Sequence, residues 1–110
     1  MIGTESERDW FLHLMAINEQ AFTAGHYQIA YHALMSALHT AKALGDPVAL
    51  RRVEQVATAQ QDRIDTESPE HRFSTQKAGL HGVLGLFRMA ARQAAARAII
   101  LARRSRTTRP

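Results

Sequence analysis

The stretch from Trp10 to Leu44 constrains the fold of this chain most, because its apolar residues recur at helical spacing on both sides of a short turn. Its second half carries one apolar face, made of Tyr27, Ala30, Leu34, Ala37, Leu38, Ala41 and Leu44. Its first half carries two adjacent apolar lines, Trp10, Leu14, Ile17 and Ala21 beside Phe11, Met15 and Phe22. Gly25 lies between the halves, and helices joined so tightly must pack antiparallel.

A second boundary follows the hairpin. Gly45 comes directly after Leu44, where a left-handed residue ends many helices. Asp46 and Pro47 then supply an N-cap and a first-turn proline, so we expect a third helix from Pro47 to about Asp65.

The hairpin resembles a tetratricopeptide repeat over roughly residues 11–47, about a third of the chain. The matching residues are Gly25, Tyr27, Ala30, Leu34, Ala37 and Leu38, ahead of the Asp46-Pro47 break. The first helix departs from the family pattern, since the Leu-Gly pair of the family falls on Ile17-Asn18 and its tyrosine on Ala21. An ordinary helical hairpin in a small bundle would have the same apolar pattern.

We therefore predict an all-α protein, either solenoid-like or a small bundle, that forms a single helical domain over residues 1–110. Residues 4–65 would hold three helices, of which the first two form the tetratricopeptide-like hairpin. The polar stretch 66–73 reads as a linker or exposed loop, because it contains a proline and no periodicity. A long C-terminal helix would then span residues 74–104, followed by a basic tail, 105–110.

That last helix is apolar over most of its circumference, which predicts burial on more than one side. Glycines recur every third residue near its start, and they would let another helix approach closely or would merely bend it. We expect a two-fold homodimer through this helix, although the helix could instead pack on its own chain, swap between chains or await a partner. The candidate contacts are Gly79, Gly82, Gly85, Leu84, Phe87 and Leu101.

Charge is distributed unevenly along the chain. All ten acidic residues precede Phe73, whereas the charged residues from Phe73 to Pro110 are lysine and arginine only. The alternative function is therefore a small nucleic-acid-binding protein, with phosphate contacts from Arg88, Arg92, Arg103 and Arg104. A solvated tail would have the same composition, and a membrane surface is a less favoured partner.

No motif for catalysis or metal binding is present in the sequence. His32 and His39 lie about 10 Å apart by helical rise, which is too far for one ion. The acidic residues near Glu5 and Asp62 sit at expected helix ends, without an enclosed site that would tune them. We thus expect no enzyme, no metal and no cofactor. The absence of cysteine and of an apolar signal core at the N-terminus fits a cytoplasmic protein.

The expected function is a non-catalytic module that binds a protein or peptide and self-associates. The resemblance implies where the partner would bind, since the inner surface of such repeats comes from the first helix. Mapped onto this chain, that face consists of Leu12, Met15, Glu19, Phe22 and Thr23. Core or dimer contacts are the alternative for these residues, above all for Met15 and Phe22.

Overall fold

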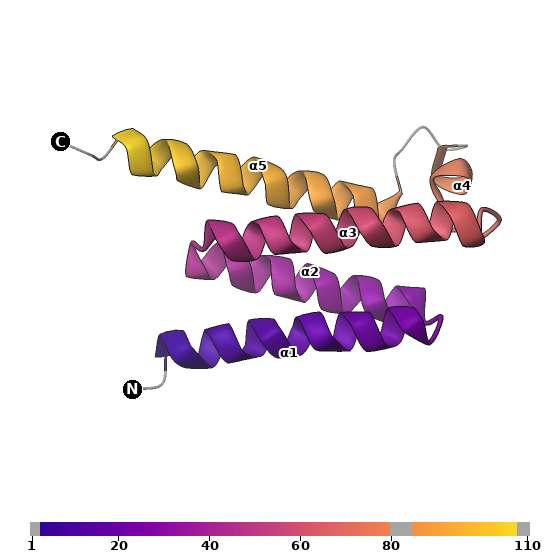
Figure 1. The fold of residues 1–110 in the computed structure, drawn as a ribbon, viewed down its shortest axis with the longest axis horizontal. Coiled ribbons are helices and arrows are strands. Elements are labelled where there is room, and N and C mark those ends of the chain that lie inside the picture. The colour runs from indigo at the N-terminus through magenta and orange to yellow at the C-terminus, as the bar shows by residue number, and fades with distance from the viewer. Residues whose placement is uncertain (1–2, 80–84, 108–110) are drawn as a thin grey trace.

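Four long helices run up and down side by side in the computed structural model, in the order α1, α2, α3 and α5 across the view of Figure 1. Their bounds are α1 Gly3–Thr23, α2 Tyr27–Leu44, α3 Pro47–Glu67 and α5 Leu86–Thr107, with a short α4 at Thr75–Gly79. The structure describes residues 3–79 and 85–107, without the side chains of residues 3–6, 79 and 105–107. The described chain is helical without strands, so the all-α prediction is confirmed.

The two turns of the hairpin region form as the sequence predicts. Gly25 has φ 84° and Gly45 has φ 63°, both in the left-handed region that favours glycine. The backbone N–H of Gly45 donates to the carbonyls of Ala41 and Lys42 and so ends α2. Asp46 then caps α3, because its carboxylate accepts hydrogen bonds from the N–H groups of Val48 and Ala49 at 3.0 and 3.2 Å.

The core lies where α2, α3 and α5 meet. Leu34 and Leu38 of α2, Leu50 of α3 and Phe87 of α5 are completely buried. The apolar face predicted for α2 and the buried side of α3 face this core, with buried alanines between the larger side chains that let the helices approach closely. Overall dimensions of 51 × 30 × 17 Å make the molecule a flat slab, which leaves both edge helices open on one side.

The long C-terminal helix predicted over residues 74–104 is wrong in one respect: it is two helices. Gly85 is not helical, and α5 starts at the next residue. The predicted linker 66–73 is also not a free loop, since α3 continues to Glu67 and both Phe73 and Ser74 are buried. Ser74 Oγ accepts a hydrogen bond from the N–H of Lys77 at 3.1 Å and so caps α4 instead of a longer helix.

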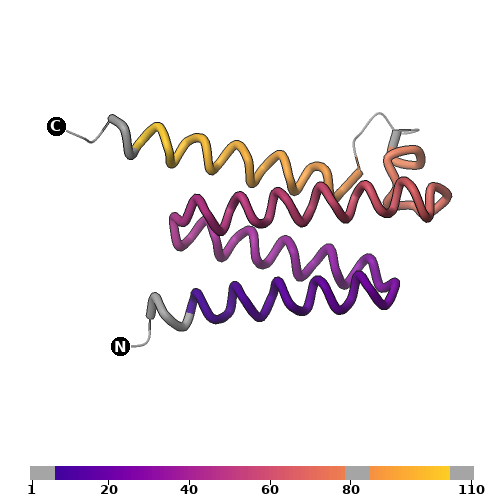
Figure 2. The backbone as a smooth tube through the Cα atoms, in the orientation of Figure 1, coloured from indigo at the N-terminus to yellow at the C-terminus, as the bar shows by residue number. Residues whose placement is uncertain are grey.

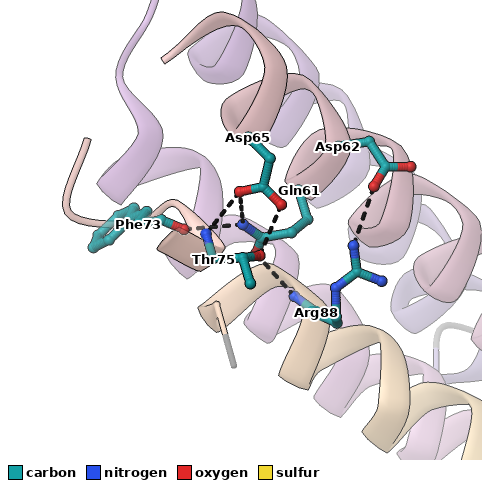
Figure 3. A network of polar contacts seen from close by, with 6 residues as sticks. All are labelled: Gln61, Asp62, Asp65, Phe73, Thr75 and Arg88. Atoms are coloured by element: carbon teal, nitrogen blue, oxygen red, sulfur yellow. Dashed lines mark hydrogen bonds and ion pairs between the residues drawn. The ribbon is translucent and has the colours of Figure 1, made fainter. Parts of the chain in front are cut away.

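A buried glutamine explains the break. Gln61 of α3 is completely buried, and its Nε2 donates to the carbonyl of Phe73 at 3.0 Å and to Asp65 at 3.1 Å (Figure 3). Its Oε1 accepts from the backbone N–H of Arg88, in the first turn of α5, at 3.2 Å. One side chain thus holds the segment before α4 and the start of α5 against α3.

Asp65 completes this network. It accepts hydrogen bonds from the N–H and the hydroxyl of Thr75, both at 2.7 Å, and thereby holds the start of α4 (Figure 3). Burial by itself would raise the pKa of Asp65, but the hydrogen bonds from Thr75 and Gln61 and the nearby charge of Arg88 keep that pKa below its ordinary value. The carboxylate therefore stays ionised where it is needed as an acceptor.

Two of the six residues expected to pair two chains, Gly85 and Phe87, are instead packed inside their own chain. A Cβ added at Gly85 would lie 2.6 Å from Cδ and Nε2 of Gln61. The space beside this glycine is therefore filled by Gln61 of the same chain and is not open to a second copy. Phe87 is completely buried in its own chain, and Leu101 is half-buried. Gly82 and Leu84 lie outside the described residues, and for Gly79 the structure describes only the backbone.

Replacing Gly85 with alanine should lower the free energy of unfolding by about 1–3 kcal/mol, because Gln61 must move and give up buried hydrogen bonds. Urea unfolding of the variant measures this. In a Gln61→Ala background the added methyl meets nothing rigid, so Gly85→Ala should cost clearly less there. Equal costs in both backgrounds would contradict this explanation of the glycine.

His71 links the same segment to α2. Its ring packs edge-on against Tyr27 with centroids 4.9 Å apart, and its Nδ1 accepts a hydrogen bond from the N–H of Phe73 at 3.0 Å. Burial lowers the pKa of His71, and the charge of Arg72 lowers it further. The folded state therefore takes up this proton at a lower pH than the unfolded state does.

Stability should consequently fall as the pH drops from neutral through the ordinary histidine value, because the unfolded state then binds more protons. The loss continues until the pH reaches the lowered folded pKa. Urea midpoints measured at about pH 7.5 and about pH 5.5 should differ more for the natural protein than for His71→Asn, which keeps an acceptor for Phe73 but does not titrate. The same midpoint shift in both proteins would exclude His71 as the cause.

Candidate binding groove between α1 and α3

An open groove of about 310 Å³ runs between α1 and α3. We call it the α1–α3 groove, and it is lined by Met15, Asn18, Glu19, Phe22 and Thr23 of α1 and by Arg52, Val56, Ala59, Gln60 and Arg63 of α3. The groove forms because α1 and α3 both pack on α2 and make few contacts with each other. Side chains such as Asn18 and Gln60 bridge the space between them.

Four of the five residues of the predicted partner face line this groove: Met15, Glu19, Phe22 and Thr23. The fifth, Leu12, is 48% exposed and lines a neighbouring hollow of about 160 Å³. Arg52 borders both spaces. Met15 and Phe22 are only 4% and 6% exposed, so these two also belong to the core, as the alternative interpretation had it.

A reciprocal pair of amides crosses the floor of the groove. Asn18 donates to Gln60 Oε1 at 2.9 Å, and Gln60 donates back to Asn18 Oδ1 at 2.7 Å. The Nδ2 of Asn18 also donates to the carbonyl of Ala30 at 2.9 Å, so one side chain ties α1 to both α2 and α3. Both amides are buried, and these bonds satisfy groups that would otherwise be costly to remove from water.

Two arginines give the α3 wall of the groove a positive charge. The guanidinium of Arg63 lies 5.8 Å from the ring centre of Phe22 and pairs with the exposed Glu67 at 3.2 Å. Within the described part of the chain, the exposed side chain of Arg52 makes no ion pair or hydrogen bond. Nearby Asp46 does not neutralise it, since that carboxylate pairs with Arg8 at 2.9 Å. This bond is the main cause that lowers the pKa of Asp46.

The arginines proposed for nucleic-acid contact are spread along α5. Arg88 pairs with Asp62 of α3 at 3.1 Å, so its charge is already partly compensated (Figure 3). Arg92 is exposed one turn further on, whereas Arg103 lies about 16 Å beyond Arg92 by helical rise. The described residues of α5 do not gather these cations into one cluster beside a groove.

Other kinds of site are not visible in the described residues. No group of three or more histidine, cysteine or acidic side chains lies close enough there to hold a metal ion. Among the same residues, no helix combines the length and the apolar character needed to span a bilayer.

The polar residues of the groove floor could not be identified from the sequence. Gln60 follows Ala49, Leu50, Val53 and Ala57 at helical spacing and is buried with them, but nothing near it in the sequence identifies its partner. Asn18 occupies the position of the glycine in the Leu-Gly pair of the family. A polar residue at this position is the one feature of the sequence that could have indicated a polar contact here. Arg52 and Arg63 have no feature in the sequence that separates them from other surface arginines, and only the position of α1 makes them the wall of a groove.

In comparisons with known proteins, no family model, no curated protein and no solved structure matches the chain.

Asn18→Leu should lower the free energy of unfolding by about 1–3 kcal/mol, because the buried amide of Gln60 then lacks its partner. Adding Gln60→Leu should recover part of this loss, since neither amide then remains buried and unpaired. Urea unfolding of both single variants and the double variant measures the coupling. Strictly additive losses would show that the two amides do not act as a pair.

Proposed function

We propose that this protein is a non-catalytic interaction module that binds a peptide segment of a partner protein in the α1–α3 groove. The observation that carries the proposal is a positively charged wall beside a partly apolar floor, open to solvent over the length of several turns. The arrangement of the helices supports a tetratricopeptide-like interpretation. In it, α1–α2 is one antiparallel pair and α3–α5 a second, with residues 68–85 inserted between the helices of the second pair.

The chemistry of the walls suggests the class of peptide. Val56, which is half-buried, offers apolar surface for a side chain of the ligand, and the nearly buried Met15 and Phe22 also line the groove. Arg52 and Arg63 offer guanidinium groups that bind carboxylates through paired hydrogen bonds. A segment that carries apolar side chains beside aspartate or glutamate fits both features.

Peptide binding by the arginines of the groove is better supported than nucleic-acid binding by the arginines of α5. Each set contains one paired arginine, Arg63 with Glu67 in the groove and Arg88 with Asp62 on α5. The two surfaces differ in shape, since the groove arginines border a concave surface with apolar and amide groups, whereas those of α5 stand on a convex helix. A convex row of cations supports affinity for phosphates without selecting a sequence.

A random peptide library displayed on phage provides the test, because it requires no knowledge of the natural partner. We expect the selected peptides to combine acidic and apolar residues. Arg52→Glu should weaken their binding about tenfold or more, as loss of a charge-assisted contact predicts. Fluorescence polarisation with a labelled selected peptide measures the change.

Arg92→Glu is the matched control, because it makes the same charge change on an exposed α5 position outside the groove. It should leave peptide affinity nearly unchanged. Equal weakening by both variants would indicate a general charge effect and contradict the groove as the site. Failure to select any peptide, or binding that is insensitive to Arg52→Glu and to Val56→Glu, would also contradict the proposal.

A further inference from the structure

The two edge helices of the slab each leave an apolar stripe exposed. Figure 2 shows α1, in indigo, along one edge and α5, in orange and yellow, along the opposite edge. Trp10 on α1 is 62% exposed and Ile17 is 44% exposed. Met89 and Ile100 on α5 are each 41% exposed. Isolated apolar side chains are ordinary on a surface, but these lie in rows on helices that have no further neighbour.

Both rows have the spacing of a helix-packing seam. The stripe on α1 consists of Glu7, Trp10, Leu14, Ile17 and Ala21, at steps of three and four. The stripe on α5 consists of Met89, Gln93, Ala96, Ile100 and Arg103, at steps of four and three. Every residue of the α5 stripe is exposed, and those of the α1 stripe are exposed or half-buried. Such alternation presents a straight line of side chains to a second helix.

The stripes match each other in antiparallel alignment. When Trp10 is set opposite Ile100, each remaining position of one stripe falls opposite a position of the other. The resulting pairs are Glu7–Arg103, Trp10–Ile100, Leu14–Ala96, Ile17–Gln93 and Ala21–Met89. Leu14 meets a small residue and Met89 meets another, as interdigitating helices require, and the charged pair closes one end with opposite signs.

Charge also favours this pairing over a contact between two copies of α5. No acidic residue occurs in α5, so its arginines would repel those of a second α5. The first turns of α1 are rich in acid, and α1 begins at the same end of the molecule at which α5 ends (Figure 1). A second copy placed beside the first in the same orientation brings these ends together, and α5 then lies antiparallel to the neighbouring α1.

We infer that copies of this protein associate head to tail, with α5 of one copy packed along α1 of the next. The surface of α1 is shaped for this, because Trp10 and Leu14 border an open hollow of about 430 Å³ with His39, Thr40 and Ala43 of α2. Ile100 of the neighbouring copy fits into this hollow. Each copy keeps one free stripe after pairing, so the contact adds further copies and does not stop at two.

This inference is independent of the α1–α3 groove, because no residue of either stripe lines it. It replaces the expected two-fold contact through the last helix by a contact between two different surfaces. Gly85 and Phe87 take no part in it, since Gly85 lies against Gln61 of its own chain and Phe87 is completely buried beside Phe22, Tyr31 and Phe73.

The first experiment follows the mass of the full chain by sedimentation velocity over about a thousandfold range of concentration. The average mass should rise with concentration beyond that of two copies. Trp10→Glu and Ile100→Glu should each reduce the protein to a monomer, because each places an unpaired carboxylate in the seam. Ile29→Glu is the matched control, since Ile29 is an exposed isoleucine of α2 outside both stripes, and it should assemble as the natural protein does.

Mixing the two monomeric variants distinguishes this contact from a two-fold one. The Trp10→Glu protein keeps an intact α5 stripe, and the Ile100→Glu protein keeps an intact α1 stripe. Together they should form a complex of one copy of each, and no larger species. Circular dichroism confirms that both variants are folded. A natural protein that stays monomeric throughout, or two variants that remain monomers on mixing, would overturn the inference.

Discussion

The structure depends on two adjacent buried amides of α3. Gln60 points toward α1 and pairs with Asn18, whereas Gln61 points toward the start of α5 and the segment before α4. A buried amide is tolerated only when its donors and acceptor are bonded, so each glutamine selects one arrangement of its neighbours. Apolar packing alone would allow the helices to slide, and these two side chains set where α1 and α5 lie along α3.

The groove and the open edges follow from this central position of α3. The Gln60–Asn18 contact between α3 and α1 forms the floor of the α1–α3 groove, and Arg52 and Arg63 of α3 line one side of it. Its network on the other side breaks the C-terminal segment at Gly85 and turns the apolar face of α5 inward. α1 and α5 lie at opposite edges of the slab, and each of them keeps exposed apolar side chains. The proposed peptide binding and the proposed association of copies therefore use separate surfaces.

Residue patterns predicted the first half of the chain well, because its signals are local. A glycine at each left-handed turn, the Asp46 cap and apolar spacing act within a few residues of each other. The candidate face came from the family resemblance instead, and four of its five residues line the groove. The second half was harder, since the apolar residues around Gly85 continue a helical pattern across the break. The reason for that break, Gln61, lies on another helix and has no signature of its own.

The sequence by itself determined the helical class, the α1–α2 hairpin, the start of α3 and the separation of acidic from basic segments, because propensity, capping and charge need no distant partner. Only the tertiary structure decided that α5 packs on α3, that Phe87 is core and that Arg52 and Arg63 border a groove. These features depend on contacts between residues far apart in the chain. Such contacts are selected by the shape and the hydrogen-bonding needs of buried side chains, which periodicity does not encode.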